Sequence, residues 1–151
     1  MTKQGVCVFD IDNTLTCGTT LCSVSQIENM IKSIDLCKQN NMAIEINTAR
    51  PPQDNVLFGI DQKVLDSIGD IKPYTREPDG IQVEMQKLIN MKKIARKHNV
   101  SEKKTILFDD VKSTCDLLNK HDIPTVHVRQ MNGITNEEYE EFKVKLDNII
   151  Y

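Results

Sequence analysis

Residues 6–16, "VCVFDIDNTLT", run a short apolar segment directly into two aspartates two positions apart. The apolar, partly β-branched run predicts a buried strand over 5–9. Side chains alternate between the two faces of a strand, so Asp10 and Asp12 would project to the same side of its end. At ~4 Å two carboxylates repel each other by ~4 kcal/mol at an effective dielectric constant of ~20. The pattern therefore indicates that a cation lies between them.

The rest of the chain alternates between predicted strands and predicted helices. Further strands are expected at 42–47, 105–108 and 124–128. Helices are expected at 24–39 with Ser23 as N-cap, at 53–68 with an interruption at Gly59, at 82–98, at 112–121, and after a capping box from Thr135 to Glu138. Alternation of this kind predicts an α/β fold: a single Rossmann-like domain over 1–151, with a mainly parallel sheet covered by helices on both faces.

Composition narrows the class of protein. The 151 residues are 39% hydrophobic and 27% charged, as expected for one globular domain. No apolar run is long enough to span a bilayer, and the basic-then-apolar start of a signal peptide is missing. We therefore expect no membrane partner and an intracellular, cytoplasmic location. The net charge of −3 gives no general attraction to nucleic acid.

The five cysteines are an odd number and include no CxxC pair. Cys7 and Cys37 lie among apolar residues and are expected to be small core fillers. A reducing, intracellular setting fits this usage best.

Polar side chains follow three of the predicted strands where each ends. Asp10 and Asp12 follow the first strand, Thr48 follows the second, and Asp109 and Asp110 follow the strand at 105–108. Ligands of open α/β sheets bind at the carboxyl ends of the strands. These three strand ends are therefore expected to form one site.

At this level the sequence resembles the haloacid dehalogenase (HAD) superfamily, whose members are mostly phosphatases. "DIDNT" is similar to its DxDxT signature, Thr48 in "NTAR" to its second motif, and "LFDD" to its acidic fourth motif. The third motif is a lysine near the start of the helix that precedes the acidic strand. The resemblance implies a Mg²⁺-dependent phosphomonoester hydrolase that works through an aspartyl-phosphate intermediate.

The chemistry of the residues agrees with these roles. Asp10 is suited to attack phosphorus, and Asp12 to protonate the leaving oxygen and later accept a proton from water. Mg²⁺ prefers oxygen ligands, and the expected ones are a carboxylate oxygen of Asp10, the backbone carbonyl of Asp12, and the pair Asp109 and Asp110. The residues expected to bind the phosphoryl group are Thr14 (through nearby backbone N–H groups), Thr48, Ala49 and Arg50.

Three lysines on one predicted helix compete for the third motif. Lys87 lies early in the helix, with Met91 and Ile94 as the following apolar positions. Lys92 and Lys93 lie deeper in the helix and farther from the carboxyl edge. Lys87 is therefore the expected charge-balancing lysine.

Short connections predict an enzyme without a cap domain, because neither 15–47 nor 49–86 leaves room for one. Similar capless proteins act on phosphoproteins or nucleic-acid ends, and others use a neighbouring subunit as a lid over small phosphorylated metabolites. The acidic chain makes nucleic acid the less favoured substrate. The flap at 15–24 and the loop at 69–81 are expected to set substrate preference, with Arg50 and Arg76 as possible contacts.

Two other classes of protein deserve comparison. A receiver domain also surrounds Mg²⁺ with acidic residues, a Thr and a Lys, but it carries the adjacent acidic pair on its first strand, whereas here the pair comes late. A non-catalytic HAD-like, phosphate-binding module is the remaining alternative. No glycine is followed by lysine, so a Walker A loop is absent from the sequence.

Overall fold

A four-stranded parallel sheet organises residues 2–130 and 132–151, the part of the chain that this computed structural model describes. The strand order is β2-β1-β3-β4, and each neighbouring pair is parallel. The strands are β1 (Gly5–Phe9), β2 (Met42–Ile46), β3 (Thr105–Asp109) and β4 (Thr125–His127). The predicted α/β, Rossmann-like fold is confirmed.

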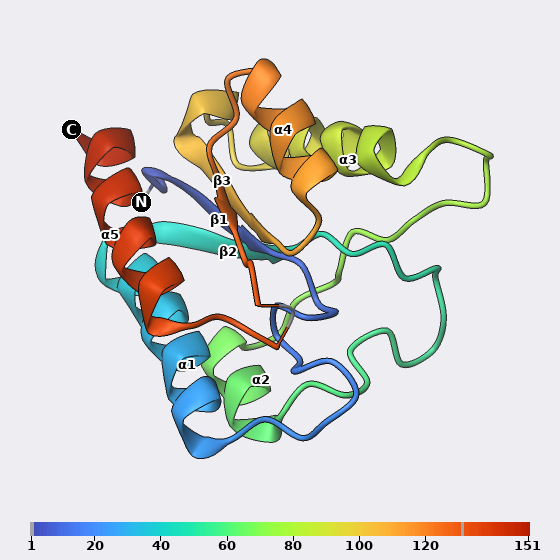
Figure 1. The fold of residues 1–151 in the computed structure, drawn as a ribbon. Helices are drawn as coiled ribbons and strands as arrows, with labels where there is room; N and C mark the ends of the chain where they lie inside the picture. Colours follow the sequence, from blue (N-terminus) through green and yellow to red (C-terminus); the bar gives the residue numbers. More distant parts are fainter. Residues whose placement is uncertain (1, 131) are drawn as a thin grey trace.

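Helices cover both faces of this sheet (Figure 1). They are α1 (Val24–Gln39), α2 (Gln62–Ile68), α3 (Val83–Lys97), α4 (Lys112–Lys120) and α5 (Asn136–Ile150), with a short 3₁₀ turn, η1 (Glu102–Lys104), before β3. Helices α1, α2 and α5 lie on one face, and α3 and α4 lie on the other. Within the described residues, no helix is both long enough and apolar enough to cross a bilayer.

The alternation of side chains along β1 divides the core in two. Cys7 and Phe9 pack toward α1 and α5, whereas Val6 and Val8 pack toward α3 and α4. Phe9 stacks on Phe108 of β3 with ring centroids 4.8 Å apart, and Phe108 meets Phe142 of α5 edge-on at the same distance. A strand buried on both faces explains why the sequence at 6–9 is continuously apolar.

The predicted helix at 53–68 is wrong in its first half. Turns occupy 54–59, and α2 begins only at Gln62, with Asp61 as its N-cap. Gly59 has φ +88°, which is incompatible with a right-handed helix. Arg50 also opposes a helix before Gly59, since its Nη1 donates to the carbonyls of Val56 and Phe58 at 2.8 and 2.6 Å.

Four of the five cysteines form disulfides, which corrects the expectation of unpaired core fillers. Cys7 of β1 pairs with Cys37 of α1, and Cys17 pairs with Cys22 in the loop before α1. The Cα atoms are 6.3 and 5.3 Å apart, within the range that disulfides require. Cys7 and Cys37 are buried as predicted, but the spacing in sequence gave no sign that β1 and α1 bring them together.

Candidate active site

The strand order brings Asp10 and Asp109 to neighbouring strand ends. β1 pairs with both β2 and β3. The chain adds β2 on one side of β1, and then adds β3 and β4 on the other side. Such a reversal leaves a crevice at the carboxyl ends of the two strands, which is where open α/β sheets bind ligands. The long loops of the protein gather at this end, whereas both chain termini lie at the opposite end (Figure 1).

Lys87 joins the two aspartates. Its Nζ lies 2.8 Å from Asp10 Oδ1 and 2.6 Å from Asp109 Oδ2, and all three side chains are at most 6% exposed. Lys92 and Lys93 lie farther along α3; Lys92 pairs with Glu102, and Lys93 is exposed. Among the three lysines considered from the sequence, Lys87 is therefore the one that contacts the aspartates.

Burial and charge shift the pKa values of this pair. Burial raises the pKa of Asp10 well above its usual value; Lys87 opposes that rise and the nearby Asp109 adds to it. Burial alone would lower the pKa of Lys87, but the attraction and hydrogen bonds of Asp10 and Asp109 raise it above its usual value. Lys87 therefore stays protonated at neutral pH, and the protonation of Asp10 is sensitive to any added positive charge.

Asp110 completes a cluster of carboxylates that is suited to a cation. One oxygen from each of Asp10, Asp109 and Asp110 lies within 4.8 Å of the others. When all three carboxylates are ionised, they and the ammonium of Lys87 leave two negative charges uncompensated, which matches one divalent cation. All the donors are hard oxygens, so these residues fit Mg²⁺ or Ca²⁺ better than a softer metal.

Three asparagines that sequence reasoning missed support the cluster. Asn13 adopts a left-handed conformation, φ +62°, and its Nδ2 donates to Asp110 Oδ2 at 3.0 Å. Asn47 donates to the carbonyl of Lys87 at 3.0 Å and accepts a 3.0 Å hydrogen bond from Asn90. Asn13 could have been noticed, since asparagine tolerates this conformation, but no sequence signal linked Asn47 to Lys87.

Asp12 stands apart from the carboxylate cluster. Its two carboxylate oxygens accept hydrogen bonds from Nη2 and Nε of Arg50, at 2.8 and 3.1 Å. Its side chain is 58% exposed, whereas that of Arg50 is 8% exposed. Arg50 thus fixes the carboxylate of Asp12 at the rim of the site, and the predicted metal contact through the Asp12 backbone carbonyl stays a prediction.

Thr14, Thr48 and Ala49 lie in the two loops beside Asp10. The buried Thr48 hydroxyl accepts a hydrogen bond from the Arg50 N–H at 3.1 Å. The Thr14 N–H is occupied by the Ile11 carbonyl, and within the described residues the buried Thr14 hydroxyl has no hydrogen-bond partner. Ala49 is half-buried between Thr48 and Arg50. The phosphoryl site expected at these residues stays a prediction.

A cavity of about 600 Å³ opens beside Asp12. It lies between the loop 16–22, which the Cys17–Cys22 disulfide closes, and the segment 58–61. The flap and the loop at 69–81 were expected to set substrate preference together, and of these two segments only the flap borders this cavity among the described residues. That loop instead runs beside the end of β2, where Tyr74 and Arg76 donate backbone hydrogen bonds to Ile46 and Arg50.

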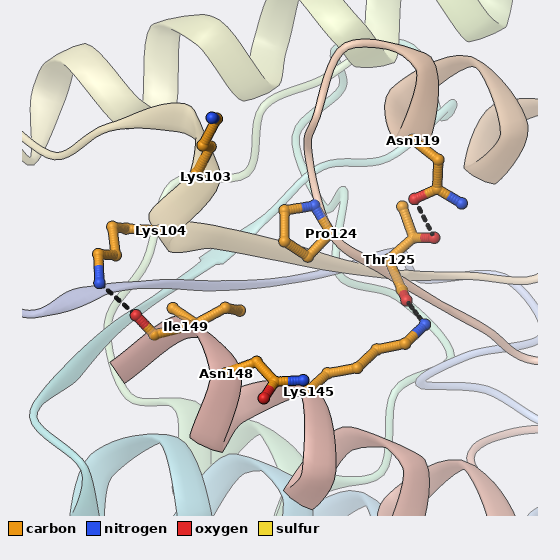
Figure 2. A pocket seen from close by; sticks show the side chains of 8 residues that line it. All are labelled: Lys103, Lys104, Asn119, Pro124, Thr125, Lys145, Asn148 and Ile149. Carbon is orange, nitrogen blue, oxygen red and sulfur yellow. Dashed lines mark hydrogen bonds between the residues drawn. The ribbon is translucent and has the colours of Figure 1, made fainter. Parts of the chain in front are cut away.

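A second cavity, of about 460 Å³, lies at the other end of the sheet, between η1, the start of β4 and α5 (Figure 2). Lys104 and Lys145 reach into it, but their Nζ atoms donate to the carbonyls of Ile149 and Thr125 (Figure 2). Asn119 accepts from the Thr125 hydroxyl at 3.1 Å. Among the described residues that line this cavity there is no carboxylate, whereas three carboxylates gather at the first site.

Comparison with known proteins yields neither a matching family model nor a matching curated sequence.

Proposed function

We propose that this protein is a Mg²⁺-dependent phosphomonoester hydrolase whose nucleophile is Asp10. The observation that carries the proposal is the buried Lys87 between Asp10 and Asp109, with Asp110 close by, at the reversal of the sheet. The order of Asp10, Asp12, Thr48, Lys87 and Asp109–Asp110 along the chain, which resembles the HAD superfamily, supports the same function.

In this proposal the reaction has two steps. A carboxylate oxygen of Asp10 attacks phosphorus, the bond from phosphorus to the ester oxygen breaks, and Asp12 gives a proton to the leaving alcohol. Water then attacks the aspartyl-phosphate and loses its proton to Asp12, which releases inorganic phosphate, frees the carboxylate of Asp10 and leaves Asp12 protonated, as it was before the first step. Lys87 holds one oxygen of Asp10 and offsets the negative charge that gathers on the phosphoryl group.

Asp10, Asp109 and Asp110 are the residues that would hold the cation. When bound, Mg²⁺ would screen the carboxylates and polarise the phosphoryl oxygens. Thr48 and the backbone at 11–14 would orient those oxygens from the other side.

The partner we propose is a phosphorylated small metabolite or phosphoprotein, with a nucleic-acid end as a less favoured substrate. A second copy of the chain as lid belongs to the same proposal. The intracellular location stays a proposal, and the two disulfides count against a reducing compartment.

One observation favours the alternative, a phosphate-binding module without catalysis. Both oxygens of Asp12 accept hydrogen bonds from Arg50, and a proton donor must give up at least one of them. Turnover separates the two functions, because a binding module would retain phosphate without hydrolysing an ester.

The test is hydrolysis of p-nitrophenyl phosphate by the purified protein with Mg²⁺, with and without EDTA. Asp10→Asn should abolish turnover, while the exposed Asp70→Asn should leave it unchanged. Borohydride reduction during turnover should convert residue 10 to homoserine, which mass spectrometry detects. Full activity in Asp10→Asn would refute the mechanism, and absence of turnover in the unaltered protein would favour the binding module.

A further inference from the structure

The cavity beside Asp12 has a distinct chemical character. Two large apolar side chains border it with much of their surface in solvent: Leu21 is 97% exposed and Phe58 is 49% exposed. Ile60 adds apolar surface, and Thr16, Thr19 and Thr20 add hydroxyl groups. A volume of about 600 Å³ is in the range of small-molecule sites. Binding of an apolar ligand that covers these exposed apolar groups is favourable, because it removes their surface from water.

The charges around the cavity disfavour a ligand that carries a second anionic group besides its phosphoryl group. Asp12 and Asp61 both line it, and among the described residues that line it Arg50 is the one cation. Arg50 is already committed: it donates to both oxygens of Asp12 and to the carbonyls of Val56 and Phe58. Its guanidinium also lies 3.8 Å from the centre of the Phe58 ring. A second anionic group on a ligand would therefore meet a carboxylate at Asp61 and no free positive charge.

We infer that this cavity holds the leaving group of the substrate, and that this group is an uncharged alcohol carrying an aromatic ring. The inference rests on the proposed function, because it is Asp12, the proposed proton donor, that places the leaving oxygen at the mouth of the cavity. The aromatic ring covers Leu21 and lies against Phe58, while the phosphoryl group stays over Asp10. Aromatic rings pack well against one another in offset or edge-on geometry.

Binding and turnover test this inference separately. Affinities of benzylphosphonate and ethylphosphonate, which cannot be hydrolysed, are measured by calorimetry with Mg²⁺. The kcat/KM values of benzyl phosphate and ethyl phosphate are compared in parallel, since both esters release an alkyl alcohol. We expect a preference of at least about tenfold for the aromatic member of each pair, as partial burial of a ring provides.

Substitutions at the cavity test whether it is the source of the preference for the aromatic ligand. Leu21→Ala and Phe58→Ala should each reduce it at least about threefold, whereas Val144→Ala, an equally apolar change at an exposed position of α5, should not. A carboxylate on the para position of the ring should weaken binding about tenfold. Asp61→Asn should restore part of that loss, because it removes the negative charge that repels the carboxylate of the ligand. The variant should keep α2 intact, since asparagine also serves as an N-cap.

Equal affinity for the two phosphonates, or a preference that Leu21→Ala and Phe58→Ala leave unchanged, would overturn the inference. Turnover of both esters at equal kcat/KM would overturn it while supporting the proposed function. Preferential binding of benzylphosphonate without turnover of either ester would instead overturn the proposed function and support the cavity as an aromatic subsite.

Discussion

Lys87 is the residue on which the candidate site depends. It is buried between Asp10 and Asp109, and its ammonium is the charge that allows two carboxylates to share a nearly dry edge of the sheet. Removing one partner of a buried ion pair leaves an uncompensated charge, which typically costs ~3–5 kcal/mol. The same residue should therefore affect both stability and catalysis.

Lys87→Ala should lower kcat roughly 10²–10³-fold, since it removes a contact that strengthens as charge develops. It should also lower the free energy of unfolding in urea. Lys92→Ala and Lys93→Ala, on the same helix, serve as controls and should change kcat less than about twofold. Similar small effects at all three positions would contradict the role of Lys87.

The raised pKa of Asp10 predicts that metal binding depends on pH. A proton on Asp10 competes with a divalent cation, so the affinity for Mg²⁺ should rise as pH increases through that pKa. Without metal the sign for stability is opposite: the contribution of Asp10 is present at low pH and lost as pH rises through its folded-state pKa. Calorimetric titration with Mg²⁺ at several pH values measures the first effect, and a weaker pH dependence in Asp10→Asn is the control. An affinity independent of pH would exclude a protonated Asp10.

The residues of the site were predictable to different degrees. Asp10, Asp109 and Asp110 lie at the carboxyl ends of the neighbouring parallel strands β1 and β3, so the parallel sheet was enough to bring them together. Lys87 required the resemblance to a known motif as well. Asn47 and the disulfide partners of Cys7 and Cys17 could not be predicted, because these contacts, which join residues 40, 30 and 5 positions apart, depend on side-chain packing that no local pattern records.

At the scale of elements, local sequence signals located most helices and strands. α1 begins where Ser23 and Gln26 form a capping box: Ser23 Oγ accepts from the Gln26 N–H at 3.2 Å, and Gln26 Oε1 accepts from the Ser23 N–H at 2.6 Å. The failure at 53–61 has the opposite cause. There the side chain of Arg50, six and eight residues before Val56 and Phe58, binds carbonyls that a helix would need, so a contact from outside the segment overrides the local pattern.

The capping box predicts a measurable share of stability. Ser23→Ala should lower the free energy of unfolding by about 1 kcal/mol, as loss of an N-cap usually does. Ser25→Ala, an exposed position in the first turn of α1, should lower it by less than about 0.5 kcal/mol because alanine favours helix. Denaturant unfolding measures both. Equal losses would mean that the first turn of α1 is held by packing and not by its cap.

At the scale of the whole molecule, the two ends of the sheet differ in the contacts that they carry. The end with the chain termini carries lysines that bind carbonyls of α5 and β4 (Figure 2). The other end carries the candidate site and the loops that border its cavity (Figure 1). The Cys7–Cys37 disulfide ties β1 to α1 between them. Ligand-dependent change is therefore expected at the loop end alone.

Hydrogen exchange with and without Mg²⁺ and orthovanadate, a phosphate mimic, tests that expectation. Loops that shield a reacting group are mobile without ligand and become ordered when it binds, so amides at 16–22 and 58–61 should exchange at least about threefold more slowly in the complex. Amides of α5 serve as the internal control and should not change. Asp10→Asn should weaken the protection if the mimic sits on Asp10. Protection confined to 69–81, the loop named from the sequence, would show that the substrate enters from the β2 side and that the cavity beside Asp12 does not shield the phosphoryl group.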